Sequence, residues 1–247
     1  MSGFRFLLVP LLLVPITVFA QSTYGSDVSS MEMEGTIGPY RVGLNYTVRN
    51  DTKLIAAHYF YASQLRNIPL TGSIHGETVE WKGSDGSAFH LHFVGNGSNG
   101  NEPLTFYNSV GLRGTWVLGS RTLPVDLRGG WSTPNPGERF YGYVTTESDA
   151  SFESMVEAAQ KAILSANPAL TAKYVHFPLR VNLERGHLLL HNPAELRANW
   201  SRVFPPRFVK RLREDIPHEM FGHEGETSLG PGDLWFDDKG ITAVNVE

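Results

Sequence analysis

The chain has 247 residues, a formal net charge of −4 at pH 7 and no cysteine. The lack of cysteine excludes disulfides, a thiol nucleophile and a thiolate zinc site. Basic residues cluster over 207–213, a short stretch that suits the solvated face of a helix. We therefore expect no nucleic-acid partner, because such a partner requires a wider positive surface.

Residues 1–20 have the features of a secretory signal peptide. Arg5 supplies a short basic start, an apolar run follows from Phe6 to Phe19, and the small residue Ala20 suits a signal peptidase. This run of about 14 residues is shorter than the ~20 that a membrane span needs. We expect cleavage near Ala20, a periplasmic or secreted location, and no membrane span in the mature chain.

Residues 34–128 predict an antiparallel β domain. Segments rich in β-branched and aromatic residues alternate with turns of Gly, Asn, Asp or Ser, which is typical of an all-β meander. Because such a chain must protect its strand edges, we expect a barrel that is closed or nearly closed. The expected strands lie in segments 35–48, 54–63, 68–76, 77–83, 88–95, 104–110, 111–119 and 121–129.

Residues 129–148, rich in Gly and Pro at their start, predict a linker, and the pattern then becomes helical. Apolar residues at helical spacing predict a helix over 151–164, with Asp149 and Ser151 as candidate caps. Helices and strands that follow one another in this way predict an α+β domain over 149–247, with one curved antiparallel sheet. Its other expected elements are a short helix at 170–174, strands at 176–182 and 188–191, helices at 193–204 and 205–213, and strands at 226–229, 232–236 and 240–246.

The order of these elements resembles the cone-shaped fold of nuclear-transport-factor-like, SnoaL-like and ketosteroid-isomerase-like domains. The likeness covers about 100 residues, 149–246, and is strongest in "FPL" at 177–179 and "GDLWF" at 232–236. Residues 34–128 are similar, through "EGTIG", "HYFY" and "GTW", to a small β-rich domain of uncharacterised exported bacterial proteins. The first resemblance implies an interior that can form an apolar pocket.

We expect such a pocket to be lined by Tyr174, His176, Arg180, Trp200, Asp233 and Trp235. The alternative is that the aromatic residues of this set belong to the core. Arg180 is expected to pair with Asp233 or Glu195, or to meet an anionic ligand, because an unpaired buried charge is costly. An enzyme of this fold requires a buried base facing an acidic donor. The six residues match no such pair, and we assign no catalytic residue.

Histidines suggest two candidate metal sites. The stretch "HEMFGHE" looks like a zinc protease motif, but His223 follows His218 at i+5, whereas a zincin helix requires i+4. A loop could still bring both imidazoles and a glutamate onto a metal, the alternative being a polar surface loop. Alternation along a strand places His90 and His92 on one face, without an obvious third ligand nearby, and the alternative is a solvated face of the barrel. We assign no metal and no cofactor.

These observations favour an exported binding or scaffolding protein of the bacterial envelope. Its partner would be an envelope protein, a cell-wall component or a small apolar ligand. The alternative is an isomerase, dehydratase or hydrolase of small molecules that uses a pocket in the cone-shaped domain. The enzyme hypothesis requires a cavity with two titratable side chains facing each other, whereas the binding hypothesis predicts a filled interior and an exposed apolar patch elsewhere.

Overall fold

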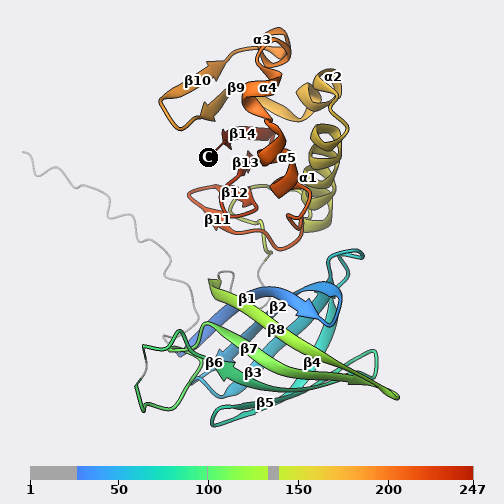
Figure 1. The fold of residues 1–247 in the computed structure, drawn as a ribbon, viewed down its shortest axis with the longest axis vertical. Coiled ribbons are helices and arrows are strands. Elements are labelled where there is room, and N and C mark those ends of the chain that lie inside the picture. The colour runs from blue at the N-terminus through green and yellow to red at the C-terminus, as the bar shows by residue number, and fades with distance from the viewer. Residues whose placement is uncertain (1–26, 99, 133–138, 247) are drawn as a thin grey trace, which may run out of the picture.

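A closed barrel of eight strands is followed by a second, six-stranded sheet with helices (Figure 1). The computed structural model describes residues 27–98, 100–132 and 139–246. The expected signal peptide and residues 133–138 of the expected linker lie outside the described residues. Within the described ranges, no helix is both long enough and apolar enough to cross a membrane.

The barrel is an antiparallel meander in which each strand pairs with the next and the last strand closes onto the first. The predicted barrel is therefore confirmed. Its strands are β1 (Val28–Ile37), β2 (Tyr40–Arg49), β3 (Lys53–Tyr61), β4 (Ile68–His75), β5 (Thr78–Gly83), β6 (Ala88–Val94), β7 (Gly111–Leu118) and β8 (Arg121–Ser132).

Two strand predictions and the predicted start of the linker were wrong in detail. Segment 35–48 is a hairpin rather than one strand, because Gly38 turns the chain with a φ of 55° that favours glycine. Segment 104–110 forms turns, and its Phe106 is buried in the barrel core instead of alternating along a strand. Residues 129–132, expected to begin a linker, continue β8.

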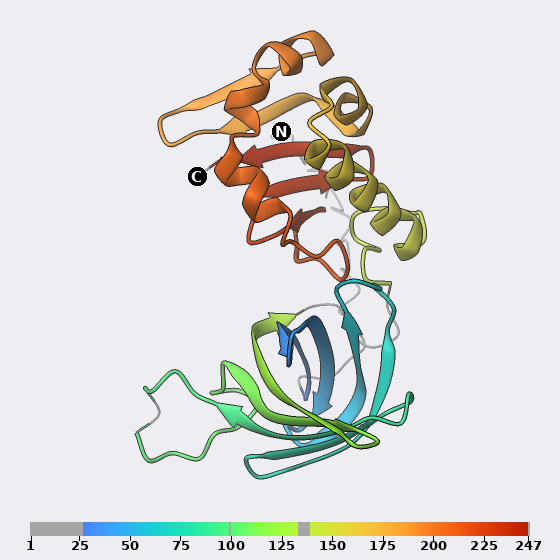
Figure 2. The same cartoon turned by 45° about the vertical axis from the view of Figure 1, so that its right-hand side comes forward.

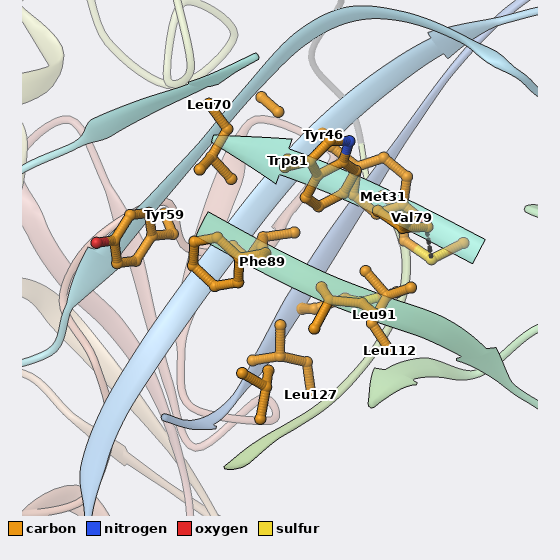
Figure 3. Packing of buried hydrophobic residues seen from close by; sticks show 14 of the residues in the cluster. Met31, Tyr46, Tyr59, Leu70, Val79, Trp81, Phe89, Leu91, Leu112 and Leu127 are labelled. Atoms are coloured by element: carbon orange, nitrogen blue, oxygen red, sulfur yellow. Dashed lines mark hydrogen bonds between the residues drawn. The ribbon is translucent and has the colours of Figure 1, made fainter. Parts of the chain in front are cut away.

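Large side chains fill the barrel interior (Figure 3). Tyr46 and Trp81 lie 5.1 Å apart between ring centroids, and Tyr59 and Phe89 lie 5.0 Å apart. Along β6, Phe89, Leu91 and Phe93 are buried while the two histidines between them are exposed. The predicted alternation is thus confirmed, and the interior is a packed core.

The second sheet has the order β10-β9-β14-β13-β12-β11. All its neighbouring strands are antiparallel except β14 and β9, which pair in parallel. The predicted wholly antiparallel sheet is wrong at this pair, because the long connection between the two strands leaves no local signal of their direction. The strands are β9 (Val175–Asn182), β10 (His187–Leu190), β11 (Gly222–His223), β12 (Glu226–Leu229), β13 (Leu234–Asp237) and β14 (Gly240–Asn245).

Helices lie against this sheet (Figure 2). They are α1 (Asp149–Leu164), α2 (Pro168–Thr171), η1 (Ala172–Tyr174), α3 (Pro193–Ala198), α4 (Trp200–Val203) and α5 (Pro206–Leu212). The predicted helix over 193–204 is divided at Asn199, whose φ of −105° and ψ of 11° are not helical. The first helix is capped by Ser148, not by Asp149 or Ser151, because the Ser148 side chain accepts the N–H of Ser151.

The buried apolar residues of the described ranges form two clusters, one within the barrel and one between the second sheet and its helices. Tyr141 belongs to the second cluster although the expected linker reached residue 148. The Asp149 carboxylate holds this segment by accepting the N–H groups of Phe140 and Tyr141. We call residues 139–246 the second unit; it lies against the side of the barrel that carries β1, β2 and β3 (Figure 1).

Candidate functional site

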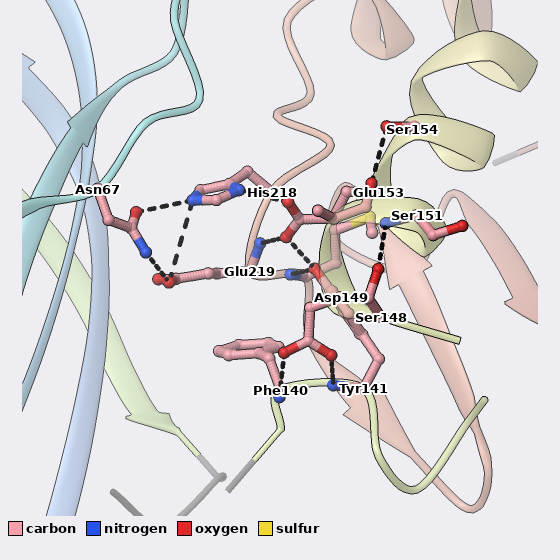
Figure 4. Close-up of polar contacts among 12 residues, drawn as sticks. Asn67, Phe140, Tyr141, Ser148, Asp149, Ser151, Glu153, Ser154, His218 and Glu219 are labelled. Carbon is pink, nitrogen blue, oxygen red and sulfur yellow. Dashed lines mark hydrogen bonds and ion pairs between the residues drawn. The ribbon is translucent and has the colours of Figure 1, made fainter. Parts of the chain in front are cut away.

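A polar network joins the second unit to the barrel (Figure 4). Glu219 lies between α5 and β11 and is only 7% exposed. His58 Nε2, on β3, lies 2.7 and 2.8 Å from the two carboxylate oxygens of Glu219. Asn67 Nδ2, just before β4, donates to Glu219 Oε1 at 2.9 Å. The carboxylate is therefore held by two side chains of the barrel.

His218 is the second member of the network. Its Nδ1 lies 2.6 Å from Glu153 Oε2 on α1, and its Nε2 lies 2.8 Å from Asn67 Oδ1. Because Asn67 must point its amide nitrogen at Glu219, its oxygen faces His218 and accepts a hydrogen bond. Glu153 Oε1 also accepts from the Tyr141 hydroxyl and from the backbone N–H of Glu219. Both imidazole nitrogens therefore face acceptors, an arrangement that favours the doubly protonated, cationic form of His218.

The directions of the pKa shifts agree with a protonated His218 and an ionised Glu219. Burial alone lowers the pKa of His218, but the hydrogen bond and charge of Glu153 and the charge of Glu219 outweigh it and raise the pKa. Burial alone raises the pKa of Glu219, but the hydrogen bond and charge of His58, the charge of His218 and the amide of Asn67 outweigh it and lower the pKa. The imidazole of His218 thus lies between the carboxyl groups of Glu153 and Glu219.

Glu219 has a backbone φ of 49°, in the left-handed region that residues other than glycine rarely adopt. Such a conformation costs on the order of 1 kcal/mol or more and persists only where surrounding contacts impose it. The contacts here are those of the carboxylate with the barrel and of the backbone N–H with Glu153. The strained backbone is therefore part of how the side chain reaches the barrel.

A cavity of about 280 Å³ lies beside the network, and we call it the acidic cleft. Its carboxyl groups come from β1 of the barrel, through Glu32 and Glu34, and from the second unit, through Asp215 and Glu219. Its lining residues are Glu32, Glu34, Asp215, Ile216, His218, Glu219, Met220, Phe221, Ser228, Gly230 and Pro231. Four carboxyl groups and one imidazole thus line a small, partly open volume together with apolar side chains.

Asp215 is the most unusual group of the acidic cleft. Its Oδ2 atom is buried and has no hydrogen-bond partner among the described residues. Burial, followed by the negative charges of Asp233 and Glu34, raises the pKa of Asp215 to about 6. Gly230 lies so close that a Cβ atom there would fall 2.6 Å from Oδ2. Gln160 donates to the backbone carbonyl of Asp215 and fixes this segment against α1.

The acidic cleft also has an apolar part. Ile216 and Met220 are buried, whereas the ring of Phe221 is 57% exposed. A second cavity, of about 350 Å³, shares Asp215 and Ile216 with the acidic cleft and is lined on the barrel side by Tyr40 and Arg41, among others. The space between the barrel and the second unit therefore offers both charged and apolar surface.

The six residues expected to line a pocket are not brought together around a cavity of this kind, since none of them lines the acidic cleft or the cavity beside it. Tyr174 and Trp200 pack against the second apolar cluster, and the Trp200 ring lies 4.7 Å from that of Phe204. Trp235 is half-buried on β13. The alternative that these aromatic residues belong to the core describes Tyr174 and Trp200 best.

The polar members of that set have partners within the second unit. His176 Nδ1 lies 2.5 Å from Asp237 Oδ2. Asp233 is buried and binds the guanidinium of Arg211 through both oxygens, at 3.0 and 2.9 Å. Arg180 is exposed and donates to Asn182. The expected pairing of Arg180 with Asp233 or Glu195 was wrong, because Arg211 on α5 binds the first carboxylate and the second accepts from His191 and Asn192.

The two histidine motifs are separated in the structure. His218 is bound in the network, whereas the side chain of His223 is 62% exposed and lies 3.6 Å from Glu224. On the barrel, His90 pairs with Glu80 and His92 is exposed. Across the described ranges, no three residues of the metal-ligating types are placed to hold a metal ion.

Sequence reasoning singled out His218 and Glu219 but missed their partners Asn67 and Glu153 and the carboxyl group of Asp215. The available signal was "DIPHE" at 215–219, in which two carboxyl groups and an imidazole fall within five residues between a helix and a strand. The partners lie about 65 and 150 residues away along the chain, as the sequence separations of their contacts with His218 show. No local pattern connects residues so far apart.

Comparison with protein-family models finds no match, and comparisons with curated proteins and with solved structures find no significant match. The resemblance to cone-shaped domains therefore stays a prediction from the order of elements. An inference about function has to rest on the network and the acidic cleft themselves.

Proposed function

We propose that the protein is an exported binding protein of the bacterial envelope and that its ligand lies in the acidic cleft. The observation that carries this proposal is the buried Oδ2 atom of Asp215, which has no hydrogen-bond partner among the described residues. Buried polar atoms are nearly always hydrogen-bonded, so an acceptor without a partner, in a residue that lines a cavity, suits a donor that arrives with a ligand. Carboxyl groups from both the barrel and the second unit line the same volume.

The lining of the acidic cleft indicates the chemistry of the ligand. Four carboxyl groups favour a positively charged group with several N–H donors, and the exposed ring of Phe221 suits the face of a cation or an apolar stem. The volume of about 280 Å³ is at the lower limit of the roughly 300–1,000 Å³ typical of ligand pockets. The ligand is thus a small molecule, or a terminal group of an envelope protein or of a cell-wall component.

The packing of the second unit supports binding outside its interior. Phe152, Phe208, Phe236 and Leu234 are buried in its apolar cluster, in the region where a pocket was expected. The order of one long helix, a hairpin, shorter helices and further strands supports the cone-shaped architecture that we propose for this unit. Its interior serves as a core, and the polar groups gather at its border with the barrel.

The alternative is an enzyme acting on a small molecule, and one observation favours it. A carboxyl group whose pKa is raised to about 6 in a cleft is suited to donate and accept a proton near neutral pH. Asp215 would then be the acid or base, and the cationic His218 would stabilise negative charge. Turnover of a bound compound, lost in the Asp215→Asn variant, distinguishes this alternative from binding alone.

Native mass spectrometry of the protein taken from the exported fraction tests the proposal. We expect a small bound mass that denaturation releases. The Pro231→Trp variant, which places a large ring on an exposed residue of the cleft, should lose this mass. The matched control is Pro103→Trp, an exposed proline in the loop between β6 and β7 that does not line the acidic cleft. A bound mass that persists in Pro231→Trp would contradict the proposed site.

Export is tested separately by fractionation and N-terminal sequencing. The mature protein should begin near Gln21 and appear in the periplasm or medium, because the apolar run over 6–19 and the residues before Gln21 suit a signal peptidase. Replacing two leucines of that run with arginine should keep the precursor in the cell. A full-length protein in the cytoplasm would show that the leader prediction is wrong.

A further inference from the structure

The contacts between the barrel and the second unit are largely polar. Arg41 of β2 reaches Glu214, and the two barrel side chains of the network reach Glu219 and His218. The ring of Phe60 lies 4.4 Å from the ring of His218 and provides an apolar contact. The two large apolar clusters remain within their own units in the described ranges. Interfaces of this kind permit relative motion unless specific bonds prevent it.

We propose that the network of His58, Asn67, Glu153, His218 and Glu219 is a proton-dependent latch that holds the second unit against the barrel. The latch is closed when both glutamates are ionised and His218 carries two protons. It opens when His218 loses a proton or Glu219 gains one. This proposal goes beyond ligand binding, because it concerns the arrangement of the two units.

In the closed state the side chains of His218 and Asn67 each have a hydrogen-bond partner on both sides. His218 donates to Glu153 on one side and to Asn67 on the other. Asn67 accepts from His218 through its oxygen and donates to Glu219 through its nitrogen. Each bond fixes the direction of the next, so the amide cannot turn over without placing like groups against each other.

Loss of a proton from His218 disrupts this chain of hydrogen bonds. A neutral imidazole has one N–H, so either Glu153 or Asn67 Oδ1 then faces a lone pair. Asn67 cannot adapt, because its nitrogen is engaged by Glu219. The raised pKa of His218 places this event on the alkaline side of the ordinary histidine value.

Gain of a proton on Glu219 disrupts the same chain of hydrogen bonds at its other end. A neutral carboxyl group no longer balances the positive charge of His218 or accepts a charge-assisted hydrogen bond from His58. The lowered pKa of Glu219 places this event on the acidic side of the ordinary glutamate value. The latch is therefore closed over the range between these two titrations and opens beyond each limit.

The other ionisable groups near the latch act on it through their charge. Glu32 and Glu34 of β1 and Asp215 line the adjoining cleft, and the hydroxyl of Tyr141 donates to Glu153. The pKa of Tyr141 is well above its ordinary value because of burial and the charge of Glu153, so this hydroxyl keeps its proton throughout the range. Ionisation of the cleft carboxyl groups favours the cationic form of His218 and so favours the closed latch.

The absence of cysteine makes a distance measurement direct, because two introduced cysteines are the only labelling sites. Lys82 on β5 and Arg185 before β10 are exposed and lie in different units. The full chain with Lys82→Cys and Arg185→Cys, labelled with a donor and an acceptor dye, reports the distance between the units by single-molecule energy transfer. We expect one narrow population near neutral pH and a second, more separated population at both pH limits, with an unchanged far-ultraviolet circular dichroism spectrum.

Variants identify the residues responsible. His218→Gln should abolish the change in distance at alkaline pH, because an amide does not titrate there. His176→Gln is the matched control, since His176 makes a similar contact with a carboxylate, 2.5 Å from Asp237, but wholly within the second unit. This control should leave the changes in distance at alkaline and at acidic pH as they are in the wild-type protein. Asn67→Asp, at an exposed barrel position that does not threaten folding, should raise the ratio of separated to closed molecules at neutral pH about tenfold by repelling Glu219.

A pH-independent distance would overturn the latch, as would the same pH profile in His218→Gln and His176→Gln. If His218→Gln does not fold, Asn67→Asp decides the matter: an unchanged distance at neutral pH in that variant would also overturn the proposal. The measurement needs no ligand, so its failure leaves the proposed binding function untouched. Conversely, a working latch without any bound mass would refute the ligand proposal alone.

Discussion

At the scale of single residues, the pKa values of two carboxyl groups four positions apart in the chain are shifted in opposite directions. The pKa of Asp215 is raised by burial and by the charges of Asp233 and Glu34. The pKa of Glu219 is lowered, since the contacts that His58, His218 and Asn67 make with the carboxylate outweigh its burial. Proximity in sequence does not decide the ionisation of these groups; their partners across the structure do.

Asp215 predicts a pH dependence of stability with a defined sign. Its pKa rises from 3.8 to about 6 on folding, so its contribution is favourable below 3.8 and is lost as the pH rises through about 6. Asp215→Asn should therefore increase the free energy of unfolding at pH 8 by about 1–2 kcal/mol, less than ~1.4 kcal/mol per pKa unit would give, because the group is partly solvated.

Urea denaturation of the wild-type protein and Asp215→Asn at pH 4 and pH 8 measures this difference. The gain should be small at pH 4, where the wild-type carboxyl group is largely protonated in the folded protein. Asp238→Asn, at an exposed position outside the cleft, should change little at either pH. An equal gain for Asp215→Asn at both pH values would show that ionisation is not the cause.

At the scale of helices and strands, local periodicity predicted most elements and failed where distant contacts decide. The helix α1 buries Phe152, Val156, Ala159 and Ile163, the positions whose spacing predicted it. The segment 104–110 has the composition of a strand, yet it forms turns that carry Phe106 into the barrel core. Local sequence pattern also could not predict the direction of β9 relative to β14, because their pairing depends on the whole path of the chain between them.

The cap of α1 gives a prediction at this scale. Ser148 accepts the backbone N–H of Ser151 at 3.2 Å, and replacing such a cap with alanine costs about 1 kcal/mol. Ser148→Ala should lower the free energy of unfolding by about this amount in denaturant titrations. Ser154→Ala, an exposed position inside the same helix whose hydroxyl bonds only the preceding turn, should cost less. Equal losses would mean that capping by Ser148 is not what stabilises the helix.

At the scale of the whole molecule, two apolar clusters lie on either side of a polar border. Since the polar network and the acidic cleft both lie at this border, the arrangement of the two units bears on the proposed ligand site and on the latch. The division into two domains is a prediction that unfolding experiments can test.

Calorimetry should resolve two unfolding transitions near neutral pH. Phe106→Ala, in the barrel core, should lower the midpoint of one transition, and Leu234→Ala, in the second cluster, that of the other, because a buried large side chain contributes about 2–5 kcal/mol. Tyr107→Ala, at a position that is 47% exposed, is the control and should have a small effect. A single transition that both core variants lower together would show one cooperative body.

The sequence by itself determined the closed antiparallel barrel and the change to helices and a second sheet. Alternation along strands, helical spacing and turn residues are local properties, and burial of apolar faces enforces them wherever the segments lie. The sequence also marked His218 and Glu219 as chemically unusual, but through a metal motif that the structure does not assemble.

Only the tertiary structure decided the partners of those residues and the location of the acidic cleft. His58, Asn67 and Glu153 reach His218 and Glu219 from β3, the start of β4 and α1, and Glu34 faces Asp215 from β1. Hydrogen bonds and charge interactions act over a few ångströms, whereas these residues are separated by up to about 180 positions. No spacing rule connects them, because their meeting depends on how the second unit lies against the barrel.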